Sequence, residues 1–255
     1  MARSGSRLRK LLYPALRLLR RLSWTMGTGR DVGYDDATLA RMITASNKRL
    51  LSSGANSECE YLKPIIEGAE PQTLRILDFG GGGGSHGFAF LSQVRSWAVV
   101  ETPFMVEAAK EVLSSEGLYF HSTTESALES LGRVDILHVS GALQYTPEPM
   151  TFLLELLRSG PEVLVFEKLV TTDRSESFRY FQYSFLRDNG AFRNAKQISS
   201  WKSTRYLLTA MSRPDVMRAV LTNYEIDRLW EYPTQSHLPF GKGLEQWGFI
   251  ASKRP

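Results

Sequence analysis

A run of five glycines, Gly80 to Gly84, constrains the fold of this chain more than any other feature. It follows a short apolar segment that ends in Asp78 and Phe79, and a helical pattern begins near Ser85. Glycine has no Cβ, so its backbone can adopt positive φ, turn sharply and approach a ligand closely. The free amides at the start of a following helix can receive a polar or anionic group. This strand, loop and helix therefore predict a site for a nucleotide-like cofactor.

Two cofactor-binding patterns fit the loop. Gly82-x-Gly84-x-x-Gly87 matches the dinucleotide fingerprint, with Glu101 about 20 residues further on as the acid for the ribose. Asp78-x-Gly80-x-Gly82-x-Gly84 instead resembles motif I of the class I S-adenosylmethionine (SAM) methyltransferases. In that family the first acid ends strand one and helps bind the methionine end of SAM, while an acid ending strand two holds the ribose. The glycines satisfy both patterns, so the rest of the chain must distinguish them.

The segments after the loop alternate between apolar runs and helical patterns, which predicts a parallel sheet covered on both faces. Strands are expected at 74–79, 97–101, 118–121, 134–140 and 162–169, and helices at 85–94 and ending near 113. Two further strands, 224–232 and 246–252, are joined by a loop too short for a crossover helix, so they must pair antiparallel. We therefore predict an α/β fold: a seven-stranded, mostly parallel Rossmann-like sheet with an antiparallel last strand, preceded by N-terminal helices.

This order resembles the class I methyltransferases rather than the dinucleotide-binding dehydrogenases. More than 70 residues precede the glycine loop and have largely helical patterns, as in methyltransferases with a helical lid. Four segments are also similar to a family of methyltransferases found among surface-polysaccharide biosynthesis genes. They are Gly33-Tyr34-Asp35-Asp36, Leu77-Asp78-Phe79-Gly80-Gly81, Val99-Val100-Glu101 and Leu143-Gln144-Tyr145. The resemblance covers roughly residues 30 to 252.

The resemblance implies that SAM is held at the carboxyl ends of the first four strands. The residues expected to bind it are Asp78, Gly80, Gly82, Gly84, Glu101, Thr123 and Ser140. The candidates for catalysis, in loops at the same edge of the sheet, are Gln144, Tyr145 and His237. For Tyr145 the alternative role is packing or positioning, and for His237 it is a surface position without function. No metal site is expected.

Other polar residues lie near these candidates in the sequence. Glu167 and Lys168 come at the end of the fifth predicted strand, and His86 lies beside the glycine loop. His138 falls inside an apolar strand, which favours a buried histidine with satisfied hydrogen bonds over a catalytic one.

The segment 171–215 is an insertion rich in aromatic residues and arginines. Its members include Phe178, Tyr180, Phe181, Tyr183, Phe185, Phe192, Trp201 and Tyr206, with Arg174, Arg179, Arg187, Arg193 and Lys196. Aromatic faces and guanidinium groups suit sugars, phosphates or stacked bases, so one interpretation is a lid over the acceptor. The other is a pair of amphipathic helices that pack on the sheet.

Charge separates the N-terminus from the rest of the chain. Residues 1–24 hold seven of the 31 basic residues and no acid, so the remainder has 24 basic against 27 acidic residues, a net charge of −3. Leucines recur there at steps of three and four residues, interrupted by arginines and Pro14. This pattern is typical of an amphipathic segment on an anionic membrane surface, a docked or solvated helix, or an organellar transit peptide. Because the remainder is not basic, a nucleic-acid partner is disfavoured.

Together these observations divide the chain into a basic segment 1–30, a helical lid region 31–72 and a SAM-binding domain 73–255. The single cysteine, Cys59, excludes an internal disulfide and suits a reducing compartment, so we expect a cytoplasmic protein, peripheral at the inner membrane face. The predicted function is methyl transfer from SAM to a small-molecule or lipid-linked saccharide acceptor. A non-catalytic membrane scaffold and an NAD-dependent oxidoreductase are the alternatives.

Overall fold

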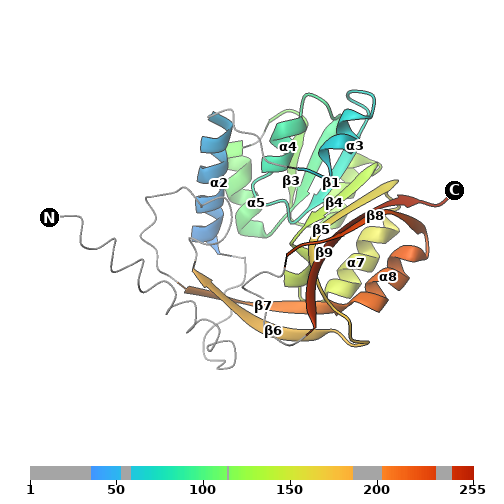
Figure 1. The fold of residues 1–255 in the computed structure, drawn as a ribbon. Coiled ribbons are helices and arrows are strands. Elements are labelled where there is room, and N and C mark those ends of the chain that lie inside the picture. The colour runs from blue at the N-terminus through green and yellow to red at the C-terminus, as the bar shows by residue number, and fades with distance from the viewer. Residues whose placement is uncertain (1–35, 53–58, 114, 186–202, 234–242) are drawn as a thin grey trace.

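The computed structural model describes residues 36–52, 59–113, 115–185, 203–233 and 243–255. Its centre is a nine-stranded sheet (Figure 1). The strands are β1 (Arg75–Phe79), β2 (Ser96–Val100), β3 (Leu118–His121), β4 (Ile136–Ser140), β5 (Val163–Thr172), β6 (Phe178–Phe185), β7 (Ser203–Ser212), β8 (Tyr224–Glu231) and β9 (Leu244–Lys253). The helices are α2 (Ala37–Ser52), α3 (Lys63–Glu67), α4 (Ser85–Phe90), α5 (Pro103–Leu113), α6 (Thr124–Leu131), α7 (Pro149–Arg158) and α8 (Arg213–Leu221), with a 3₁₀ turn η1 (Leu143–Tyr145).

The strand order confirms the predicted sheet. β3, β2, β1, β4 and β5 lie side by side and parallel, β9 pairs antiparallel with β5, and β8 pairs antiparallel with β9. These seven strands are the seven that the sequence predicts, and the reversed β9 is the feature expected of a class I methyltransferase fold. The first helix after the loop, α4, ends at Phe90 and not at the predicted residue 94.

Alternation along the parallel strands gives each face of the sheet its own core. On one face, Ile76 and Ile136 pack with side chains from α3, α4 and α5; on the other, Leu77 and Leu137 pack with α6, α7 and α8. The continuous apolar runs of β1, β2 and β4 reflect this burial on both sides.

The aromatic insertion forms strands, so the helix-pair interpretation is wrong for its described part. β6 and β7 pair antiparallel along their whole length, from Phe178 opposite Ala210 to Phe185 opposite Ser203. β7 continues the sheet by pairing parallel with the end of β5, and the hairpin extends beside the domain (Figure 1). The reason is composition: β6 is rich in aromatic residues, and aromatic side chains favour the pleated surface of a strand.

Helix α2 lies next to the glycine loop, and it belongs to the predicted lid region. It packs against α5 (Figure 1), and its buried Asn47 amide occupies the space where Gly83 lacks a side chain. The methyl group of Ile43 on the same helix is the nearest atom to the Cβ position of Gly82, at 3.9 Å. The described part of the lid region is therefore placed where it can cover a ligand on the loop.

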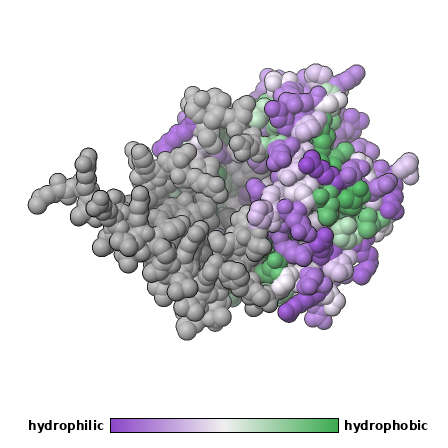
Figure 2. Space-filling model, in the orientation of Figure 1, coloured by the Kyte–Doolittle hydropathy of each residue, from purple (hydrophilic) through white to green (hydrophobic). Residues whose placement is uncertain are grey.

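The surface of the described part is mostly hydrophilic on the face shown in Figure 2, with small hydrophobic groups between. Within the described residues, no helix combines the length and apolar character needed to cross a bilayer.

Candidate functional site

The glycine loop follows the alternation of the methyltransferase-like pattern. Gly80, Gly82 and Gly84 have φ of 72°, 58° and 71°, a region that residues with a Cβ rarely adopt. A Cβ on Gly80 would lie 2.0 Å from that of Ala142, in the loop after β4. The amide of Gly80 donates to the carbonyl of Val100 over 2.8 Å, which ties the loop to the end of β2. Glycine at these positions is therefore required by backbone conformation and by close approach.

Glu101, the predicted ribose acid, lies directly after β2 and faces the loop. Its Oε1 accepts from the amide of Gly82 at 3.1 Å, and its Oε2 accepts from the amide of Thr102 at 2.8 Å. Each carboxylate oxygen can accept more than one hydrogen bond, which is what binding of ribose hydroxyls requires. The backbone contacts orient the carboxylate at the edge of the loop, where the resemblance to methyltransferases places the ribose.

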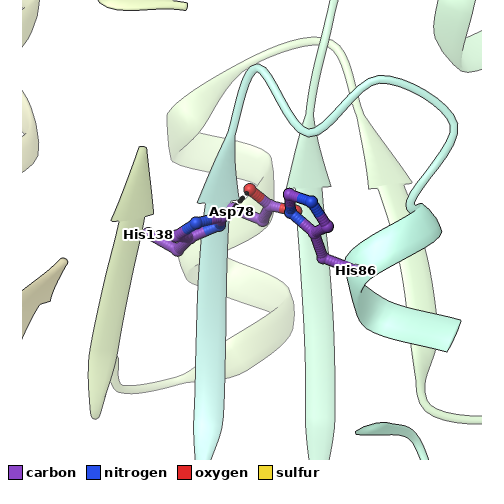
Figure 3. A group of neighbouring side chains, drawn as sticks. All are labelled: Asp78, His86 and His138. Atoms are coloured by element: carbon purple, nitrogen blue, oxygen red, sulfur yellow. Dashed lines mark hydrogen bonds and ion pairs between the residues drawn. The ribbon is translucent and has the colours of Figure 1, made fainter. Parts of the chain in front are cut away.

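Asp78 is 1% exposed, under the loop rather than on its surface. Its Oδ1 lies 2.9 Å from Nδ1 of His138, its register partner on β4, and its Oδ2 accepts from Nε1 of Trp97 at 3.1 Å (Figure 3 shows the His138 contact). A Cβ on Gly81 would lie 2.3 Å from the Asp78 carboxylate. Asp78 thus supports the turn of the loop from below.

The other ring nitrogen of His138, Nε2, lies 3.3 Å from Oε1 of Glu167 on β5, and Oε2 of Glu167 accepts from the hydroxyl of Tyr232 at 3.1 Å. With the indole of Trp97 on β2, a continuous chain of hydrogen bonds therefore crosses β2, β1, β4 and β5 and ends at Tyr232 after β8. We call it the buried polar row: Trp97, Asp78, His138, Glu167 and Tyr232. The row connects the glycine loop through β4 and β5 to Tyr232, the residue after β8.

The charges of the row depend on one another. Burial alone would lower the pKa of His138, but the neighbouring Asp78 and Glu167 carboxylates raise it to about 9. Burial alone would raise the pKa of both carboxyls, yet the His138 cation holds them below their ordinary values. Burial and the charge of His138 lower the pKa of His86 to about 4. At neutral pH the row thus contains an imidazolium between two carboxylates, beside a neutral His86.

Asp78, His86 and His138 also offer ligand atoms for a metal ion, all within 4.8 Å of one another (Figure 3). The imidazole of His86, from the first turn of α4, lies edge-on to that of His138 with ring centroids 5.2 Å apart. Because Nδ1 of His138 already bonds Asp78, a cation at this position would have to replace that hydrogen bond. The described geometry is that of an ion-pair network.

The remaining predicted residues are dispersed along the same edge of the sheet. Thr123 caps α6 by accepting from the amide of Ser126, and Ser140 ends β4. The hydroxyl of Tyr145 donates to Oε1 of Gln182 in the hairpin at 3.2 Å, which agrees with a positioning role. His237 lies outside the described residues.

Gln144 lies at a distortion of β5 that the sequence does not reveal. Lys168 has φ of 54°, a strained value for a residue with a Cβ, and the β5–β9 register shifts between Phe166 and Leu169. The side-chain amides of Gln144 and Gln246 both donate to the carbonyl of Lys168, at 3.1 and 3.3 Å. Gln246, like Tyr232, was not a candidate, because only strand pairing brings it to this edge.

Comparison with known proteins identifies structures but no family. The chain matches no known family model and no curated protein. It is similar in structure to the SAM-bound amino pentose methyltransferase CalS10 from Micromonospora echinaspora, with 18% identity, 76% of this chain and 89% of that chain covered, and a TM-score of 0.48. It is also similar to magnesium protoporphyrin IX methyltransferase from Synechocystis with bound SAM. The identity is 14%, the match covers 98% of this chain and 96% of that chain, and the TM-score is 0.45.

A third similar structure is 1,6-didemethyltoxoflavin-N1-methyltransferase from Burkholderia thailandensis with bound S-adenosylhomocysteine. Its identity is 18%, 95% of this chain and 89% of that chain are covered, and the TM-score is 0.43. These three proteins act on different acceptors. The function of this chain must therefore follow from its own residues.

Proposed function

We propose that this protein is a SAM-dependent methyltransferase. The observation that carries the proposal is the glycine loop after β1: Gly80, Gly82 and Gly84 alternate at positive φ, and Glu101 faces them from the end of β2. The antiparallel β9 supports the same conclusion against a dehydrogenase. Gly87 does pack closely on Trp97 and Leu118, as the third glycine of a dinucleotide fingerprint would, so NAD is the competing cofactor to test.

The residues present fit SAM. Among the described residues, the nearest atom to the Cβ position of Gly82 is a methyl carbon of Ile43, at 3.9 Å, so the backbone at Gly82 allows close approach by a ligand. Glu101 would accept from the ribose hydroxyls, the loop would lie along the methionine part, and Thr123 and Ser140 would contact the cofactor from the ends of β3 and β4. Asp78 would act mainly by supporting the loop.

When bound, SAM supplies an electrophilic methyl group, which the acceptor takes by in-line displacement while the C–S bond breaks and S-adenosylhomocysteine leaves. The protein must hold the nucleophile in line and exclude water. Gln144, Lys168 and Glu167 lie beside the end of β4, where this nucleophile would approach, and the acceptor proton would pass to solvent. Tyr232 stays protonated, because burial raises its pKa, and it orients the Glu167 carboxylate.

The first experiment is calorimetric titration of the full chain with SAM, S-adenosylhomocysteine and NAD. We expect micromolar binding of the first two and no response to NAD. NAD binding without SAM binding would overturn the proposal, and retained SAM binding without transfer to any acceptor would favour a scaffold.

Glu101→Gln tests the site at residue level. We expect SAM to bind roughly tenfold to a hundredfold more weakly, because hydrogen bonds to a charged acceptor contribute about 1.5–3 kcal/mol. The matched control is Asp135→Asn: Asp135 also accepts from a backbone amide, that of Arg75 at 2.8 Å, but at the opposite ends of the strands. Equal losses in both variants would show that the effect is structural.

For the acceptor we propose a small-molecule or lipid-linked saccharide. The support is the resemblance of four sequence segments to methyltransferases of surface-polysaccharide gene clusters, and the seven positive charges of residues 1–24, which would bring the protein to an anionic membrane. A cytoplasmic protein at the inner membrane face follows from the same two observations.

A further inference from the structure

The distortion at Lys168 holds two buried amides in a defined orientation. Gln144 is 2% exposed and Gln246 is 7% exposed, and both direct Nε2 to the same carbonyl oxygen. A reversed amide would place its oxygen against that carbonyl oxygen, so the orientation of both groups is determined by the contact. The shifted register and the positive φ of Lys168 make its carbonyl available for these two donors.

The oxygens of the two amides are left without partners. Neither Oε1 of Gln144 nor Oε1 of Gln246 has a hydrogen bond among the described residues, although both atoms are buried. Buried polar atoms are nearly always satisfied, and an unsatisfied one costs about 1–3 kcal/mol. Both amide nitrogens contact one carbonyl, so the two side chains meet beside the carboxyl ends of β4 and β5, where the antiparallel β9 begins. The Glu167 carboxylate is on the adjacent residue of β5.

We propose that Oε1 of Gln144 and Oε1 of Gln246 receive hydrogen bonds from hydroxyl or amino groups of the methyl acceptor. This inference rests on the proposed methyltransferase function and adds the residues that would recognise the acceptor. The site presents oxygens only as acceptors, so it selects groups that donate: a neutral polyol, a saccharide or an amino sugar.

The same chemistry excludes a carboxylate as the group bound here. An ionised carboxylate brings only acceptor atoms, which would leave both glutamine oxygens unsatisfied. The side chain of Lys168 does not alter this preference for donor groups, because it is exposed and its aliphatic part lies against Gly141.

The test uses the full chain saturated with S-adenosylhomocysteine and three probes: D-glucose, D-glucosamine and succinate. Saturation-transfer difference NMR measures binding of each probe at millimolar concentration. We expect glucose or glucosamine to bind and succinate not to bind. Gln144→Met and Gln246→Met, each close to glutamine in volume, should weaken sugar binding roughly tenfold, with the affinity for S-adenosylhomocysteine unchanged.

Gln72→Met is the matched control. Gln72 also donates from Nε2 to two backbone carbonyls, those of Leu91 and Ser92, but at the opposite ends of the strands. The inference is overturned if neither sugar binds to the loaded protein, if succinate binds as well as the sugars, or if the Gln144 and Gln246 variants bind sugar like the Gln72 variant. If the wild-type protein does not bind S-adenosylhomocysteine, that result instead overturns the proposed function. If either the Gln144 or the Gln246 variant fails to fold, the other variant still tests the inference.

Discussion

The imidazole of His138 lies between two carboxylates in a region from which water is excluded. Isolated buried charges are costly, but a buried pair with good hydrogen bonds on both nitrogens offsets much of that cost. Removing one member of a buried ion pair leaves the charge of the other uncompensated, which typically lowers the free energy of unfolding by about 3–5 kcal/mol. The expectation that His138 is a satisfied core histidine is confirmed, and the structure adds that its partners are Asp78 and Glu167.

At the residue scale, the row predicts how stability depends on pH. The folded pKa of His138 is about 9 against an ordinary 6.5, so its stabilisation is complete below pH 6.5 and is lost as pH rises through 9. Asp78 and Glu167 have lowered pKa values, so their stabilisation is present above their ordinary 3.8 and 4.5 and is lost as pH falls through the depressed values.

Thermal unfolding from pH 4 to pH 10 measures this dependence. Wild-type stability should fall by about 3 kcal/mol between pH 6.5 and 9 because of His138, and His138→Gln should be less stable but lack this decline. His121→Gln is the control: the pKa of His121 is lowered, mainly by burial, so its removal should leave the alkaline decline intact. An unchanged alkaline decline in His138→Gln would contradict the assigned charges.

At the scale of elements, polar and aromatic contacts join the β6–β7 hairpin to the segment after β4. Tyr145 in η1 donates to Gln182 and lies perpendicular to Tyr206 with ring centroids 5.4 Å apart, while Arg179 pairs with Glu148 before α7 at 2.6 Å. The hairpin and the loop after β4 therefore support one another, beside the place where we propose that the acceptor binds. This location agrees with an acceptor lid, although the described part is made of strands.

Tyr145→Phe separates support of the hairpin from catalysis. We expect a loss of roughly 1 kcal/mol in the free energy of unfolding, as for one neutral hydrogen bond, and unchanged SAM affinity. Denaturant unfolding and calorimetry measure the two quantities. Tyr224→Phe, which removes a buried hydroxyl bonded to the carbonyl of Pro161, is the matched control for stability. Full stability combined with lost methyl transfer would show instead that the Tyr145 hydroxyl acts on the acceptor.

At the scale of the whole molecule, charge divides the chain into a basic N-terminal segment and a body with a net charge of −3. The high pI of the chain therefore arises from residues 1–24, which lie outside the described residues. A body of this charge gains nothing from a polyanion, whereas the segment would gain about 1 kcal/mol per basic residue near an anionic surface.

We expect the full chain to sediment with vesicles that contain phosphatidylserine at low salt, and to be released as salt screens the attraction. Replacing Arg17, Arg20 and Arg21 by glutamine should reduce the bound fraction severalfold. Replacing the exposed Arg133, Arg158 and Arg254 removes the same charge from the body and should change little. If both triple variants bind equally, the segment is not the membrane contact.

The sequence alone determined the parallel core, the glycine loop and its two acids. Strands buried on both faces must be continuously apolar, and a loop that needs positive φ at alternate residues needs glycine there, so both features can be read along the chain. These are local requirements, and they place Asp78, Glu101 and the order of the strands without knowledge of distant contacts.

Only the tertiary structure decided which polar groups meet. The register of β1, β4 and β5 aligns Asp78, His138 and Glu167 on one face, and the antiparallel return of β8 and β9 brings Tyr232 and Gln246 to the same edge. The hairpin in the insertion likewise depends on pairing with the end of β5. Hydrogen bonds between distant residues, such as those of Asp78 with His138 and of Tyr232 with Glu167, leave no pattern in the local sequence, so only the tertiary structure defines the buried polar row.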